Sequence, residues 1–146
     1  MKIIIDSILG LKRKSISKLD YDQEYDFAVW GNVIFEFSTG RETFMGFYFS
    51  EFYRVLKRFL NSEVEEFGYY DVDDYGEDYR EKNQPFIKIK QFDADIQISF
   101  RWIDNLYTVS KQELSDCFFD FENNLLDLIE KKGKIEKSKA LKYFNL

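Results

Sequence analysis

The segment Pro85–Trp102 reads PFIKIKQFDADIQISFRW, and its alternation of side chains decides the fold class. Every second position of its latter part is apolar, namely Ile96, Ile98, Phe100 and Trp102. Ile87 and Ile89 alternate with Lys88 and Lys90 in the same way, which is typical of strands with one buried face. The FDAD connection is short enough for a hairpin, so we expect two antiparallel neighbours in a sheet that is covered on a single side.

Two stretches upstream of this hairpin are also expected strands. IIIDSIL (residues 3–9) is rich in β-branched residues, and FAVWGNVIFEF (residues 27–37) alternates. The apolar face of the second stretch consists of Phe27, Val29, Val33, Phe35 and Phe37. The turn signal Ser38-Thr39-Gly40 predicts that residues 43–47 pair back as a hairpin. Trp30 and Trp102 fall in predicted strands, where core or sheet-surface positions are expected rather than ligand-stacking platforms.

Helical periodicity replaces alternation over residues 50–61. One apolar stripe runs along this stretch, formed by Phe52, Val55, Leu56, Phe59 and Leu60. Ser50 is the expected N-cap of the helix. Arg54, Lys57 and Arg58 are expected on its remaining surface.

A second, longer helix is predicted from the capping-box spacing of Ser110 and Glu113. It runs to about Lys132, with Gly133 as its C-terminal stop. Its expected buried stripe consists of Leu114, Cys117, Phe118, Phe121, Leu125, Leu128 and Ile129. A short last helix is expected to be anchored by Leu141 and Phe144.

These elements predict a single α+β domain over residues 1–146. We expect an antiparallel sheet of about five strands, with two main helices packed on one face and a short C-terminal helix.

The composition narrows the range of chemistries. The 146 residues include no histidine, which removes the Ser-His-Asp and Cys-His nucleophile systems and the HExxH zinc site. Cys117 is the only cysteine, and its place on an apolar helix stripe favours a core position over a reactive thiol. No glycine-rich phosphate loop occurs, and no single acid is marked out as a general acid. We therefore expect no catalytic residue, no cofactor and no enzyme activity.

Residues 63–81, EVEEFGYYDVDDYGEDYRE, stand apart in charge. Nine acidic residues and one arginine give this acidic segment a net charge of −8; the whole chain carries −6, so all other residues sum to +2. Acidic charge steers a basic protein, and tyrosine supplies contact area, so the combination predicts a docking surface. The expected partner-binding residues are Tyr69, Tyr70, Asp71, Asp73, Asp74, Tyr75, Glu77, Asp78 and Tyr79. A solvated loop is the alternative interpretation of such a charge run.

The same segment superficially follows a calcium-binding loop. Counted from Asp71, Asp73 and Gly76 fall at positions three and six of an EF-hand loop. Tyr75 and Lys82 then stand at positions five and twelve, where oxygen ligands are required. No metal site is expected, and a small-molecule or calcium-binding domain stays the alternative function.

Charge and hydropathy also bear on nucleic acids and membranes. Basic clusters occur at residues 12–14 and from Lys131 onward, but a net charge of −6 opposes phosphate binding. No stretch approaches the roughly twenty apolar residues that span a bilayer, and Asp6 interrupts the initial apolar run. We expect a cytoplasmic protein without a direct nucleic-acid or membrane partner.

An acidic, histidine-free, aromatic-rich chain with tyrosines beside acids at residues 69–74 resembles the bacterial immunity proteins of toxin–immunity systems. These include the polymorphic-toxin and contact-dependent-inhibition systems. The resemblance implies a non-catalytic protein that binds and neutralises a cognate basic toxin, often a nuclease, by covering its active site or an adjacent exosite.

Overall fold

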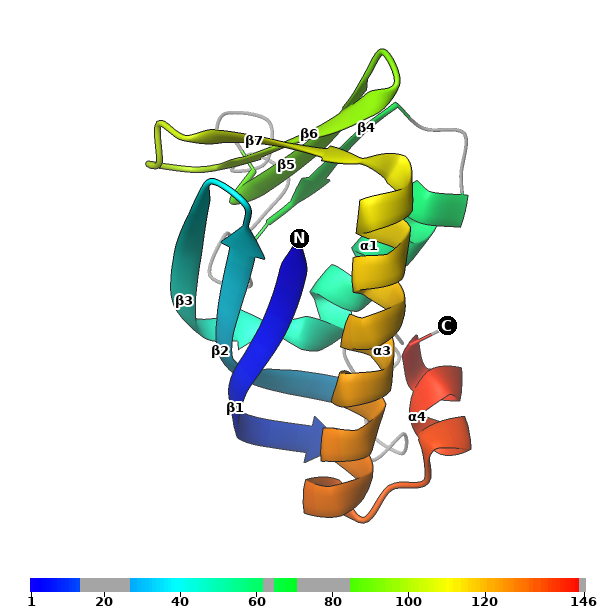
Figure 1. Ribbon diagram of the computed structural model, residues 1–146. Helices are drawn as coiled ribbons and strands as arrows, with labels where there is room; N and C mark the ends of the chain where they lie inside the picture. Colours follow the sequence, from blue (N-terminus) through cyan, green and yellow to red (C-terminus); the bar gives the residue numbers. More distant parts are fainter. Residues whose placement is uncertain (14–26, 62–64, 71–84, 145–146) are drawn as a thin grey trace, which may run out of the picture.

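The computed structural model describes residues 1–13, 27–61, 65–70 and 85–144 (Figure 1). Within these residues, two antiparallel sheets and three helices form an α+β fold. The first sheet has the order β1–β2–β3, with β1 Lys2–Arg13, β2 Phe27–Phe37 and β3 Gly40–Tyr48. The second has the order β4–β5–β6–β7, with β4 Glu66–Tyr69, β5 Ile87–Phe92, β6 Asp95–Phe100 and β7 Leu106–Ser110. The helices are α1 (Phe49–Asn61), α3 (Lys111–Gly133) and α4 (Lys137–Phe144).

The hairpin predicted from alternation is confirmed as β5 and β6. The two strands pair antiparallel, with Ile87 opposite Phe100 and Ile89 opposite Ile98, and all four side chains are buried. Asp93 lies in the turn with a φ of 53°, in the left-handed region that short polar residues tolerate best after glycine.

The first sheet contains the other predicted hairpin. β2 has the predicted bounds, and its buried side chains are Val29, Val33, Phe35 and Phe37. β1 is longer than predicted because it continues past Gly10 to Arg13 through two irregularities in its pairing with β2. At Gly31 the strands approach so closely that a Cβ atom would lie 1.9 Å from the carbonyl oxygen of Ser7, which explains a glycine in mid-strand.

The prediction of one sheet with about five strands is wrong, because the described strands form two sheets. The apolar faces of these sheets pack against each other through aromatic rings. The ring centroids of Phe35 and Phe100 are 5.2 Å apart, and Phe37 stacks on Tyr107 at 3.8 Å. Phe44 lies between the sheets in the same way, 5.2 Å from Phe100. Alternation marks one apolar face for each strand but does not say which sheet the strand joins.

Helix α1 begins at Phe49, directly after β3, so the prediction of Ser50 as N-cap is wrong. Ser50 is buried in the first turn, and its hydroxyl accepts a hydrogen bond from the Val29 N–H at 3.4 Å. The expected solvent position of Arg54 is a second correction. Its side chain is only 9% exposed, and its guanidinium donates to the carbonyl of Tyr143 at 3.0 Å. The predicted stripe is otherwise confirmed, with Phe52, Val55, Leu56 and Phe59 buried and Leu60 half-buried.

Helix α3 begins with the predicted capping box, directly after β7. The Glu113 N–H donates to Ser110 Oγ at 3.0 Å, and the Ser110 N–H donates to Glu113 Oε2 at 2.8 Å. The left-handed residue at its C-terminus is Lys134, with a φ of 54°, one residue after the predicted stop at Gly133. Of the predicted stripe, Phe118 and Leu128 are only half-buried, whereas Leu126 is buried in addition.

The two main helices pack against each other and contact both sheets, rather than lying on one face of a single sheet as predicted. Helix α1 contacts β2 in the first sheet and β4 in the second, whereas α3 lies along β1. Helix α4 forms as predicted and packs against α3, with Ala140 and Phe144 buried and Leu141 half-buried (Figure 1). Among the described helices, none has both the length and the apolar character needed to cross a membrane.

Candidate functional site

Within the acidic segment, only residues 65–70 are described. Tyr69 closes β4 and Tyr70 follows it, and the chain is described again from Pro85. The remaining predicted docking residues lie outside the described residues: Asp71, Asp73, Asp74, Tyr75, Glu77, Asp78 and Tyr79.

Tyr69 is a core residue, which corrects its expected role as an exposed anchor. Its side chain is 1% exposed, and its ring lies 5.0 Å from Phe47 and 5.6 Å from Phe52 between centroids. Its hydroxyl donates to the carbonyl of Tyr48 at 3.4 Å. The alternation of side chains along β4 places Tyr69 on the inward face. This four-residue strand was not predicted, because acidic residues surround it in the sequence. Tyr70, one residue later, is half-buried.

The described residues on either side of positions 71–84 lie at the same end of the second sheet. Tyr69 pairs with Ile87, and Ile87 pairs with Phe100, the last residue of β6. The Arg101 N–H then donates to the Phe86 carbonyl at 2.9 Å. The turn between β6 and β7 therefore lies beside the start of β5 (Figure 1).

This β6–β7 turn carries Trp102 in an unexpected position. The Ile103 N–H donates to the Phe100 carbonyl at 3.2 Å, so Arg101 and Trp102 are the central residues of a β-turn. Trp102 has a φ of 66° and is 85% exposed, so its predicted place within a strand is wrong. A positive φ at the second central position alone is the pattern of a type II turn, where glycine or asparagine is preferred. The turn-forming pair Asp104-Asn105, just downstream, was the sequence signal for a turn here.

Glu42 of β3 is hydrogen-bonded to residues that follow this turn. The Tyr107 hydroxyl donates to Glu42 Oε1 at 2.5 Å, and Asn105 Nδ2 lies 3.4 Å from the same oxygen. The hydrogen bond to Glu42 raises the pKa of the Tyr107 phenol. Phe37 of β2 stacks on the ring of Tyr107, the second residue of β7, so the two sheets are in contact close to the turn that carries Trp102.

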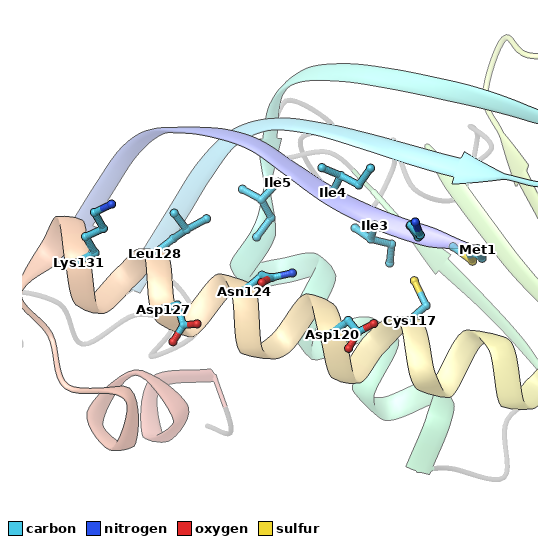
Figure 2. Close-up of a pocket in the computed structure, with 11 residues that line it drawn as sticks. Met1, Ile3, Ile4, Ile5, Cys117, Asp120, Asn124, Asp127, Leu128 and Lys131 are labelled. Atoms are coloured by element: carbon cyan, nitrogen blue, oxygen red, sulfur yellow. The ribbon is translucent and has the colours of Figure 1, made fainter.

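A separate groove of about 530 Å³ lies between β1 and α3 (Figure 2). The groove is lined by residues 1–5 on one side and, on the other, by six residues of α3: Cys117, Asp120, Asn124, Asp127, Leu128 and Lys131. Asp127 forms an ion pair with Lys137 of α4. Burial raises the pKa of the Cys117 thiol to about 11, so the thiol is protonated at neutral pH, as expected for a core cysteine. The groove combines charges of both signs with an unreactive thiol.

A partly buried polar cluster joins α1 to α3, and sequence reasoning missed it. The Tyr53 hydroxyl donates to Glu122, and Lys57 Nζ donates to the Tyr53 oxygen at 3.1 Å. Burial, followed by the Glu122 carboxylate, raises the pKa of Tyr53 well above its ordinary value. The cluster ties the helices together and keeps the phenol protonated.

Comparison with protein-family models, with curated proteins and with solved structures finds no match for this chain. Within the described ranges, no group of three or more potential metal ligands gathers. The loop compared above with a calcium site, residues 71–82, lies wholly outside those ranges.

Proposed function

We propose that this chain is a non-catalytic immunity protein that binds and neutralises a basic protein toxin, with nuclease activity expected of the toxin. The observation that carries the proposal is the charge distribution. Residues 63–81 hold a net charge of −8, while the rest of the chain sums to +2. Such a concentration of one sign attracts an oppositely charged protein and raises its association rate.

The described flanks support a docking role for this segment. Glu65 and Glu66 are exposed at the start of β4, so part of the charge lies on the sheet's edge strand. Tyr69 is buried immediately before the most acidic stretch and fixes that end to the core. The segment thus departs from a rigid base, and less conformational freedom is lost at its flanks when a partner binds.

The mechanism has a long-range and a short-range part. Asp71, Asp73, Asp74, Glu77 and Asp78 steer the toxin, and Tyr70, Tyr75 and Tyr79 supply contact area. A basic nuclease needs its cationic surface to hold phosphates. An acidic protein that covers this surface therefore blocks the substrate without any chemistry of its own.

The first test is the gene neighbourhood, because an immunity gene is expected directly after a large toxin gene. The C-terminal domain of that upstream product is the probe, and the chain is expected to bind it and suppress its toxicity on co-expression. A neighbourhood of metabolic genes, or a toxin domain that the chain neither binds nor suppresses, refutes the proposal.

Charge reversal tests the segment itself. Replacing Asp73, Asp74 and Asp78 by lysine is expected to weaken toxin binding about 10- to 100-fold at low salt, mainly through slower association. The difference should shrink above 0.5 M salt, where the Debye length falls to about 4 Å or less. The matched control reverses Asp116, Asp120 and Glu130, three exposed acids of α3, and changes the net charge equally. Equal losses in both variants contradict a role for this segment.

A further inference from the structure

Trp102 combines high exposure with an unfavourable backbone conformation. Its indole is 85% exposed, the largest exposed fraction among the large hydrophobic residues of the described chain. Its φ of 66° lies where bulky side chains are disfavoured. Trp102 therefore adds no free energy of burial to the stability of the fold, and its backbone conformation costs some. Within the chain, its ring is contacted by the Arg101 guanidinium, 5.3 Å from the ring centroid. Strained positions of this kind concentrate at binding and active sites.

The turn holds the backbone of Trp102 in a defined place. Two backbone hydrogen bonds fix it, from Ile103 to Phe100 and from Arg101 to Phe86. Beneath it, the bond from Tyr107 to Glu42 fastens the turn to the other sheet. A tryptophan on a fixed backbone has only two side-chain torsions to order on binding, which suits an interface anchor.

The surroundings of Trp102 match the anatomy of a protein interface. Leu106 is 56% exposed at the start of β7, and Ile103 is half-buried, which gives the turn a small apolar centre. Asp104 and Asn105 are exposed at its margin. An apolar centre with a polar rim is typical of specific contacts between proteins.

The turn also lies at the sheet end that carries the two described flanks of residues 71–84. The Arg101 N–H bonds to Phe86, the neighbour of Pro85, and the paired residues Tyr69, Ile87 and Phe100 lie in one row across the sheet. Residues 71–84 hold six of the nine acids and are joined to the fold at this sheet end, so a basic protein drawn to them meets the fold close to Trp102.

We propose that the β6–β7 turn is a second contact surface for the same basic protein partner, with Trp102 as its apolar anchor and Leu106 beside it. This inference rests on the proposed function. The open face of the indole suits the aliphatic stem and charged head of a lysine or arginine side chain, the residues in which a basic partner is rich.

The experiment measures binding of the upstream toxin domain to Trp102→Gly, with Phe92→Ala as control. Glycine adopts a positive φ freely, so the variant should unfold at the same or a higher temperature than the natural chain. We expect its toxin affinity to fall about 30-fold through faster dissociation. Its salt dependence should equal that of the natural chain, because no charge is lost. Phe92, the last residue of β5, is 54% exposed at the opposite end of the β5–β6 hairpin and should tolerate alanine with less than about a twofold change.

Fluorine NMR gives a readout of the contact itself. The sequence contains two tryptophans, so the chain labelled with 5-fluorotryptophan has two signals, assigned through Trp102→Phe. The Trp102 signal should shift when unlabelled toxin domain is added, whereas the Trp30 signal should stay.

The outcomes separate this inference from the proposed function. A complex that forms with full affinity in Trp102→Gly, or without any shift of the Trp102 signal, overturns the inference and leaves the proposed function standing. Failure of the natural chain to bind the toxin domain overturns both. A Trp102 signal that shifts with the concentration of the chain alone shows that a second copy covers the turn, which also overturns the inference.

Discussion

Tyr69 offers the sharpest test, because the sequence and the structure give it opposite roles. If Tyr69 is a docking anchor, its substitution should weaken partner binding and change stability little. If it is a core residue, its substitution should lower the free energy of unfolding. In the structure it is 1% exposed and lies among Phe47, Phe52 and Phe86. Replacing a buried large aromatic residue by alanine costs about 3–5 kcal/mol. Domains have only about 5–15 kcal/mol in total, so Tyr69→Ala should be strongly destabilised or unfolded at room temperature.

The matched variant is Tyr69→Phe. It keeps the ring and removes a hydroxyl whose hydrogen bond to the Tyr48 carbonyl is long, at 3.4 Å, so we expect a loss below about 1 kcal/mol. Urea unfolding followed by circular dichroism measures both variants. A Tyr69→Ala chain whose free energy of unfolding stays within about 1 kcal/mol of the natural protein's, yet which binds a partner more weakly, refutes the core assignment.

Further predictions follow from the cap, the thiol and a close strand contact. Ser110→Ala should lower the free energy of unfolding by about 1 kcal/mol and the melting temperature by about 3 °C, as calorimetry can check, because it removes the N-cap of α3. The hydrogen bonds from Ser110 lower the pKa of Glu113, so its stabilising effect should be complete above the ordinary glutamate pKa of about 4.3 and fade as pH falls through the lower folded value. A melting-temperature gap between the natural chain and Glu113→Gln that widens toward pH 3 contradicts this. The Cys117 thiol, with its pKa raised to about 11, should react with a disulfide reagent at pH 8 far more slowly in the folded chain than in urea. Gly31→Ala should destabilise the chain by more than about 1 kcal/mol in urea unfolding, because the new methyl group would lie 1.9 Å from the Ser7 carbonyl oxygen.

Local patterns predicted the individual elements better than their assembly. The Ser110–Glu113 capping box, the β5–β6 hairpin and the bounds of β2 all depend on near neighbours in sequence, and all are confirmed. β4 was missed because four residues inside an acidic run offer too few alternations to stand out. The division into two sheets depends on ring contacts such as Phe37 with Tyr107, seventy positions apart, which periodicity cannot show.

The candidate site was predicted only in part for a similar reason. Charge is additive along the chain, so the acidic segment could be recognised without a fold. Exposure depends on the fold: Tyr69, expected as an anchor for a partner, is buried, and Trp102, expected at a core or sheet-surface position of a strand, is exposed in a turn. The φ of Trp102 also depends on the turn that the flanking strands impose.

The absence of any connecting residue between β3 and α1, and between β7 and α3, has a consequence for how this chain tolerates insertions. Strand β3 ends at Tyr48 and helix α1 begins at Phe49; in the same way, β7 ends at Ser110 and α3 begins at Lys111. One residue inserted at either junction would rotate the following helix by about 100°, since an α-helix has 3.6 residues per turn. The buried stripe, with Phe52 in α1 or Phe121 in α3, would then face solvent. Each strand therefore sets the rotational phase of the helix that follows it, and length variation among any natural variants should avoid these two junctions.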